Sequence, residues 1–201
     1  MNFLSIDCSI KTGSLFIKTQ SKTFNRVLQS DKLNNDLLMV QILNFFSEKK
    51  LKLNDISDIF VNQGPGNFSG LRGSLATAKG ISLSKKINLF GYNTFLWSCS
   101  KFFNKNKSIC SIVKFREKYF IKKFNRKLKS ISKPKEVTKE EIIESYKNEI
   151  KVIPKNIAKY FDREILNTNN LNVVNLDHNE LKNLQLRGLL DKDLIKPLYL
   201  G

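Results

Sequence analysis

The sequence is short of histidine, cysteine, glycine and proline, and these shortages exclude several classes of protein. One histidine and three cysteines without C-x-x-C spacing cannot form a Cys/His zinc site or a disulfide framework, so any metal would need oxygen ligands. No apolar run approaches the ~20 residues of a membrane helix, and Asp7 comes too early for a signal peptide. The sequence therefore predicts a cytoplasmic protein with no membrane segment. Its 201 residues, 41% of them hydrophobic, can fill a core, which excludes overall disorder.

Acidic residues are also scarce, and the resulting positive charge is unevenly distributed. The formal net charge is +17, and residues 101–135 carry 13 Lys/Arg against a single acid. An A/T-rich gene encodes many lysines, and this base composition explains an overall excess of cations. It explains less well why one segment holds so many, so an acidic partner such as RNA remains an alternative for this segment.

The first third of the chain has the pattern of a small sheet. Short apolar or alternating runs occur at Phe3–Ile6, Leu15–Ile17 and Phe24–Leu28, separated by turn residues, and predict three antiparallel strands. A further buried strand follows around 56–61 and ends at Asn62-Gln63.

The segment from Leu33 to Lys50 has no glycine or proline and predicts a helix capped by Asn34 or Asn35. Its apolar residues, which include Leu38, Ile42, Phe45 and Phe46, cover more than one stripe of the helix surface. Such a helix needs two partners to bury it. One is the sheet, and the other is a further helix of this chain or another protein.

Six of the nine glycines lie between residues 64 and 91. Gly64 to Gly66 form a tight turn, and a helix is predicted from about Leu71 to Lys86, with small residues on one face. Glycine inside a helix costs roughly 0.8–1 kcal/mol, so Gly73 and Gly80 favour close approach of another backbone. Phosphate binding is the alternative, but the Walker pattern is not met because Leu71-Arg72 replaces Lys-Ser/Thr.

Two motifs resemble one known family. Leu4-Ser5-Ile6-Asp7-Cys8-Ser9 is similar to the opening strand "LAIDTS", and the stretch from Gly64 to Gly80 is similar to the signature G-P-G-S-F-T-G-L-R-I-G-L-A-T-A-K-G. Both belong to the TsaB (YeaZ) family, partner subunits in bacterial tRNA threonylcarbamoyladenosine synthesis. The resemblance returns at Ile195–Leu200, similar to "RPVYLR". Little of residues 105–190 resembles the family.

The resemblance implies an α/β fold of the ASKHA type, found in actin, sugar kinases and Hsp70, with two small domains that each have a mixed sheet and helices. We expect an N-terminal domain at 1–103 and a smaller basic domain at 104–201. The superfamily holds ATP with glycine-rich loops. This chain retains only a vestigial phosphate loop, Asp7 and Ser9, and has no glycine between residues 92 and 187. We therefore expect no cofactor.

In the second half of the chain, the sequence pattern predicts fewer helices and strands. Strands are predicted at Ile109–Phe115 and Tyr119–Phe124 and around Val173-Val174, a capped helix at Thr138, and a last helix after Asp177. The two long strands resemble an edge hairpin, where lysines protect the edge; RNA contact is the functional alternative. That alternative uses Lys122, Lys123, Arg126 and Lys127.

These observations lead to one functional prediction with two competitors. The resemblance implies a non-catalytic subunit that supports a TsaD-type threonylcarbamoyl-transferase beside a TsaE-type ATPase, with tRNA bound only indirectly and a homodimer when alone. An autonomous ASKHA-type ATP-dependent enzyme or peptidase, and a basic RNA-binding module, are the alternatives. The predicted partner interface comprises Leu38, Ile42, Phe45, Phe46, Gly64, Gly66, Phe68, Gly70, Arg72, Gly73, Ala76, Thr77 and Gly80.

Overall fold

The computed structural model describes residues 2–10, 12–28, 37–105 and 108–200, which form two compact units. Unit 1 comprises Met1–Asn93 and Leu190–Gly201, and unit 2 comprises Thr94–Leu189. The sequence boundary at 103/104 differs from this division in two ways. Residues 94–103 belong to unit 2, and residues 190–200 return to unit 1.

Unit 1 contains a five-stranded mixed sheet in the order β3-β2-β1-β4-β5. The three predicted antiparallel strands are confirmed, and β4 and β5 continue the sheet in parallel with β1. The strands are β1 (Phe3–Asp7), β2 (Gly13–Lys18), β3 (Thr23–Leu28), β4 (Asp58–Asn62) and β5 (Asn88–Tyr92).

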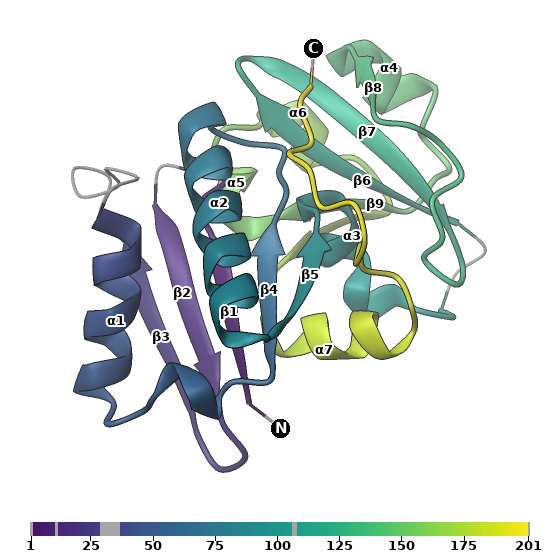
Figure 1. The fold of residues 1–201 in the computed structure, drawn as a ribbon. Coiled ribbons are helices and arrows are strands. Elements are labelled where there is room, and N and C mark those ends of the chain that lie inside the picture. The colour runs from purple at the N-terminus through teal and green to yellow at the C-terminus, as the bar shows by residue number, and fades with distance from the viewer. Residues whose placement is uncertain (1, 11, 29–36, 106–107, 201) are drawn as a thin grey trace. The chain divides into compact units, whose positions relative to one another are not determined.

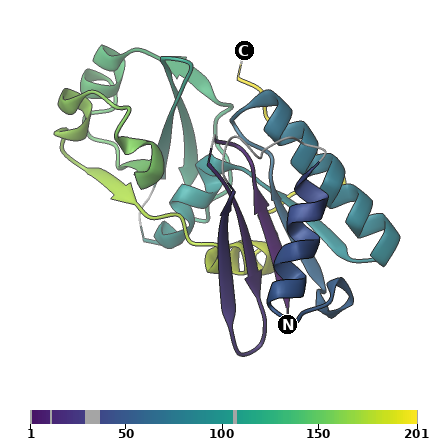
Figure 2. The same ribbon diagram turned by 90° about the vertical axis from the view of Figure 1, so that its left-hand side faces the viewer.

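Two helices lie side by side on one face of this sheet (Figure 1), and a view turned by 90° shows both on that face (Figure 2). They are α1 (Leu38–Glu48) and α2 (Phe68–Lys85); a short 3₁₀ helix, η3 (Leu53–Asp55), follows α1. Alternation along β1, β2 and β4 directs Leu4, Leu15 and Ile59 into one core with these helices. The predicted start of the first helix at Leu33, with caps at Asn34 or Asn35, lies outside the described residues.

The C-terminal segment of unit 1 closes the free edge of its sheet. Gly91 and Asp191 exchange backbone hydrogen bonds of 2.7 and 2.9 Å beside β5. Further along, the Leu198 N–H donates to the Gln63 carbonyl oxygen at 2.6 Å, and Ile195 is buried in the core. The segment therefore covers an edge strand that would otherwise present unpaired backbone groups.

Unit 2 repeats the same topology, with sheet order β10-β9-β6-β7-β8. In both sheets the first three strands of the unit are antiparallel neighbours, and the last two add in parallel beside the first. The predicted mixed α/β class with two sheet domains is confirmed. The strands are β6 (Ser108–Phe115), β7 (Lys118–Asn125), β8 (Lys135–Val137), β9 (Lys151–Pro154) and β10 (Leu171–Val174).

The helices of unit 2 are short. The predicted cap at Thr138 is confirmed: its side chain accepts from the Glu141 N–H, and the Glu141 carboxylate accepts from the Thr138 N–H. The helices are α3 (Thr94–Cys99), η4 (Ser100–Phe102), α4 (Lys139–Glu144), α5 (Lys155–Ala158), α6 (Arg163–Leu166) and α7 (Asn179–Leu186). Of the described residues, no helix is long and apolar enough to cross a membrane.

Candidate functional site: the outer face of two helices

The loop after β1 is held together by the carboxylate of Asp7. One oxygen of Asp7, Oδ1, accepts hydrogen bonds from the Ser9 N–H (2.9 Å), the Ser9 hydroxyl (2.7 Å) and the Asn62 side-chain amide (3.1 Å). All three residues are buried. The donors that a phosphate loop would present to a ligand are thus used within the chain.

The glycine-rich turn after β4 packs directly on this loop. The Asn67 N–H donates to the Ser9 carbonyl oxygen at 2.7 Å, and the Gly64 N–H donates to Asn62 Oδ1 at 2.8 Å. A Cβ atom on Gly66 or Gly70 would overlap the backbone of Ser9 or Cys8. Gly64, Gly66 and Gly70 therefore serve a turn and a close approach within unit 1, whereas the sequence assigned them to a partner.

The largest apolar side chains of α1 are buried in the core of unit 1. Leu38, Ile42, Phe45 and Phe46 are at most 3% exposed and belong to the core beneath the helix. The structure thus places all four on the sheet side, because helical periodicity gives them one common face. Replacing Phe46 with a charged residue would test folding rather than partner binding.

A second apolar stripe of α1 faces solvent. Leu37, Val40 and Leu43, spaced three apart, are 43%, 48% and 45% exposed. Their spacing puts them on the side of the helix opposite the core, so the predicted excess of apolar surface is present but on other residues.

The outward side of α2 combines small residues with exposed Arg72 and Lys79. Ala76 and Gly80 are exposed, and Gly73 and Thr77 are half-buried beside them. A Cβ atom on Gly80 would meet nothing within 4 Å, so packing among the described residues does not require glycine there. Leu83, one turn further, is 81% exposed. We call the exposed residues Leu37, Val40, Leu43, Ala76, Gly80 and Leu83 the outer helix face.

Three side chains beside the first turns of α2 form an exposed aromatic–arginine cluster. The Arg72 guanidinium carbon lies 3.9 Å from the centroid of the Phe68 ring, and the Phe68 and Tyr199 rings stack at 5.4 Å. Phe68 and Tyr199 are 47% and 46% exposed. Sequence reasoning placed Phe68 and Arg72 at the interface but missed Tyr199, although it lies in the family-like motif at 195–200. Aromatic residues and arginine are the residue types that dominate binding energy at protein interfaces.

The four cationic residues assigned to RNA contact occupy different environments. Lys123 forms an ion pair with Glu149, and the Nζ atom of half-buried Lys122 lies 5.5 Å from the Phe124 ring centroid. Arg126 and Lys127 are exposed in the turn after β7. The expected edge hairpin is wrong: β8 pairs with β7 and β9 pairs with β6, so both strands are internal. Edge protection therefore does not explain these cations.

The cysteines are all free and buried. Burial raises the pKa of Cys8 to about 12 and that of Cys110 to about 11, which disfavours the thiolate of each. Within the described ranges, no group of three His, Cys, Asp or Glu side chains comes close enough to hold a metal ion.

Sequence comparison identifies relatives of the chain. The model of the family described as TsaD, tRNA N6-adenosine threonylcarbamoyltransferase, matches residues 30–162. A tRNA threonylcarbamoyladenosine biosynthesis protein TsaB from Buchnera aphidicola subsp. Schizaphis graminum is 29% identical over 104 residues, 52% of this chain and 50% of the relative. TsaB from the subspecies Baizongia pistaciae is 30% identical over 107 residues, 52% and 48% of the two chains. The matches thus span about half the length of these relatives.

Solved structures share the whole fold. A Pseudomonas aeruginosa protein described as similar to the peptidase YEAZ superposes with a TM-score of 0.72 at 13% identity, covering 100% of this chain and 99% of the other. YeaZ from Pseudomonas aeruginosa gives 0.70 at 11% identity, with 98% and 100% covered. These neighbours confirm the expected α/β fold with two sheet domains. The chain belongs to the TsaD family, and its expected resemblance to the TsaB proteins is confirmed.

Proposed function

We propose that the chain is a non-catalytic subunit that binds and supports a TsaD-type transferase in the threonylcarbamoyladenosine (t6A37) modification of tRNA. The family match and the names of the TsaB relatives support the pathway. The outer helix face supports the role of a partner. This role places the chain in the cytoplasm, with tRNA held mainly by the catalytic subunit and a TsaE-type ATPase as a further component.

The proposal rests on the position of Gly80. It lies in the interior of α2, where glycine costs roughly 0.8–1 kcal/mol relative to alanine, and its missing side chain faces open space. A second backbone approaching α2 would use that space. The apolar residues Val40 and Leu83 on the same side of the sheet would then become buried.

The partner surface that fits the outer helix face is a pair of equivalent helices from a protein of the same fold. The catalytic subunit of the same family offers such helices, and so does a second copy of this chain. We infer that the free protein pairs with itself through the outer helix face in a two-fold arrangement and exchanges this copy for the transferase.

The test is substitution of Gly80 by leucine. Its side chain points into open space and leucine is a strong helix former, so the monomer keeps its fold. We expect Gly80→Leu to abolish copurification with the transferase and to convert the self-paired protein into monomers in analytical ultracentrifugation. Asn156→Leu, which adds an exposed leucine on α5 of unit 2, is the matched control and should change neither result. Wild-type association of Gly80→Leu would exclude the outer helix face as the interface.

The competing proposal of an autonomous enzyme is tested at the loop after β1. An Asp7→Asn substitution retains Oδ1 as an acceptor for the Ser9 N–H and the Asn62 amide. If Asp7 only supports the loop, the assembled complex keeps its modification activity in this variant. Loss of activity by more than about tenfold with the complex still assembled would assign Asp7 a chemical role.

A further inference from the structure

Two segments of unit 2 meet at the end of β7. The Asn104 N–H donates a hydrogen bond of 2.7 Å to the carbonyl oxygen of Arg126. In the turn itself, Asn125 Oδ1 accepts from the N–H groups of Lys127 (2.9 Å) and Lys129 (3.0 Å). These bonds fix the backbone of the turn and attach it to residues 101–105, so the side chains on both segments emerge from one supported surface.

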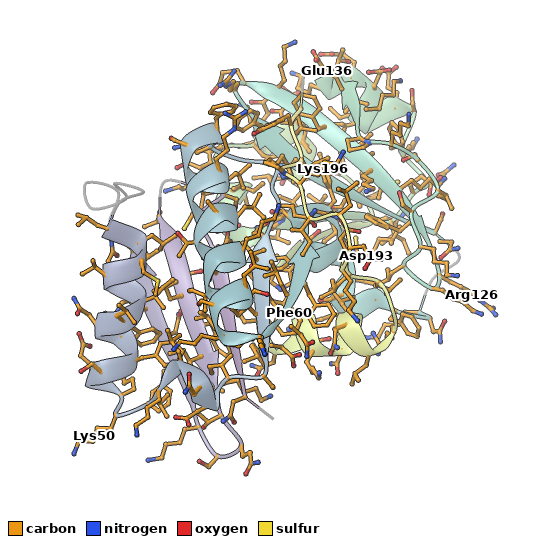
Figure 3. The ribbon with its side chains drawn as sticks, in the orientation of Figure 1. Lys50, Phe60, Arg126, Glu136, Asp193 and Lys196 are labelled. Carbon is orange, nitrogen blue, oxygen red and sulfur yellow. The ribbon has the colours of Figure 1, made fainter. Side chains whose placement is uncertain are left out.

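Six exposed cations gather on this surface, and we call them the basic end. Five come from the two joined segments, which contain no aspartate or glutamate. The sixth is at the end of α7, where the Arg187 guanidinium carbon lies 3.8 Å from the centroid of the Phe103 ring. In Figure 3 the Arg126 side chain extends outward, away from β7. The basic end comprises Lys101, Lys105, Arg126, Lys127, Lys129 and Arg187.

Elsewhere in unit 2, five lysines on β6, β7, α4 and the start of β8 each form an ion pair with a glutamate, whereas exposed Lys147, Lys155 and Lys159 form none among the described residues. The pairs are Lys114–Glu117, Lys118–Glu136, Lys123–Glu149, Lys135–Glu141 and Lys139–Glu164. Among the described residues, none of the six cations of the basic end takes part in such a pair. A lysine-rich composition supplies cations everywhere, but it does not account for the absence of aspartate and glutamate from these two joined segments.

We propose that the basic end binds the phosphate backbone of RNA, and the choice of tRNA as that RNA rests on the proposed function. The planar guanidinium groups of Arg126 and Arg187 match phosphate oxygens in a bidentate geometry, and lysines contribute sequence-independent attraction. The Arg187–Phe103 stack also offers a planar surface on which an unpaired base can stack. The surface differs from the earlier prediction: Lys123 is excluded by its ion pair and Lys122 because it is half-buried beside Phe124. Lys101, Lys105, Lys129 and Arg187 are added.

The experiment measures binding of the full chain to a fluorescently labelled tRNA transcript by anisotropy, between about 50 and 200 mM KCl. The test variant combines Arg126→Gln, Lys127→Gln and Lys129→Gln. The control combines Lys147→Gln, Lys155→Gln and Lys159→Gln, which removes three exposed cations from other parts of the same unit. Each phosphate contact contributes roughly 0.7–0.9 to the slope of log affinity against log salt. We expect the test variant to lower the slope by about 2–3 and the control to leave it within about 0.5 of wild type.

Three results would overturn the proposal. Equal losses in both variants would show that only net charge matters, and wild-type binding by the test variant would show that the basic end makes no contact. Binding to vesicles containing anionic phospholipid, lost in the test variant while tRNA binding persists, would assign the surface to a membrane. The same test variant should still copurify with the transferase through the outer helix face, so failure here is distinguishable from failure of the proposed function.

Discussion

The Nε–H group of Arg72 donates a hydrogen bond of 2.9 Å to the hydroxyl oxygen of Tyr199, 127 positions later in the chain. The carbon of the same guanidinium lies 3.9 Å from the centroid of the Phe68 ring, so two contacts hold the side chain before any partner arrives. Within the described part of the chain no ion pair reaches Arg72. A side chain that is already ordered loses less conformational entropy on binding.

We expect Arg72→Lys to weaken binding of the transferase by about 30-fold, equivalent to about 2 kcal/mol, because lysine can neither stack as a plane nor keep the bond to Tyr199. Tyr199→Phe retains the ring and removes the hydroxyl, so its effect should be smaller, about three- to tenfold. Surface plasmon resonance with immobilised transferase provides the measurement. Tyr160→Phe, at an exposed tyrosine of unit 2, is the control, and equal effects of the two Tyr→Phe variants would contradict the assignment.

The glycine at position 80 predicts opposite effects on stability and association. Gly80→Ala should raise the free energy of unfolding of the monomer by about 0.5–1 kcal/mol, because the added methyl group meets no atom within 4 Å. Thermal denaturation at low protein concentration measures this gain. If the partner backbone approaches closely, the same substitution weakens association. A variant that is neither more stable nor weaker in association would contradict both parts.

The ion pair between Lys123 and Glu149 predicts a pH dependence of stability. The hydrogen bond from Lys123 lowers the pKa of the Glu149 carboxyl below its usual 4.5, and Ser108 donates to the same group. A carboxyl whose pKa is lower in the folded state stabilises the fold above the unfolded-state pKa and loses this contribution as pH falls through the folded value. Urea denaturation of wild type and Glu149→Gln should differ by at most about 1 kcal/mol at pH 7, because the pair is partly exposed. The difference should shrink below about pH 4.5. A constant difference across this range would exclude the ion pair as its source.

The buried cysteines predict slow thiol chemistry in the native protein. Because burial raises the pKa of Cys8 to about 12 and that of Cys110 to about 11, hardly any thiolate is present at pH 8. A colorimetric thiol reagent should therefore react at the rate of unfolding and label all three cysteines in denaturant. Rapid labelling of one thiol in the folded chain would instead favour the enzyme alternative.

Much of unit 1 was predictable because its sequence follows simple periodicities. Helix α2 begins at Phe68 rather than near Leu71. Gly70 lies in the first turn of the helix, and in the sequence this glycine looks like part of the preceding loop. For α1, the number of apolar residues indicated a surplus of apolar surface. The pattern alone could not decide that Phe46 faces the sheet while Leu43 faces solvent.

Unit 2 was harder to predict because its elements are short and carry unusual residues. Strand β9 begins with Lys151, a lysine with no exposed surface, and ends at Pro154, so neither end has the pattern of a strand. The Lys151 ammonium group is accommodated by the carbonyl oxygen of Tyr146 at 2.8 Å, with those of Glu149 and Lys147 at 3.3 and 3.5 Å. Burial lowers the pKa of this lysine, an effect that depends on tertiary structure and has no signal in the sequence. The returning segment at 190–200 likewise had a recognisable motif but no indication of which edge it covers.

The return of the last residues to the sheet of unit 1 has a consequence for synthesis on the ribosome. Residues 94–189 must be translated between the two parts of unit 1, which takes roughly 5–20 s at bacterial and eukaryotic rates. During that interval the core lacks Ile195, and the backbone of β5 beside Gly91 has no cover. The nascent first unit is therefore exposed to edge-to-edge aggregation until its final segment emerges, which makes it a natural client for chaperones that shield unpaired strands.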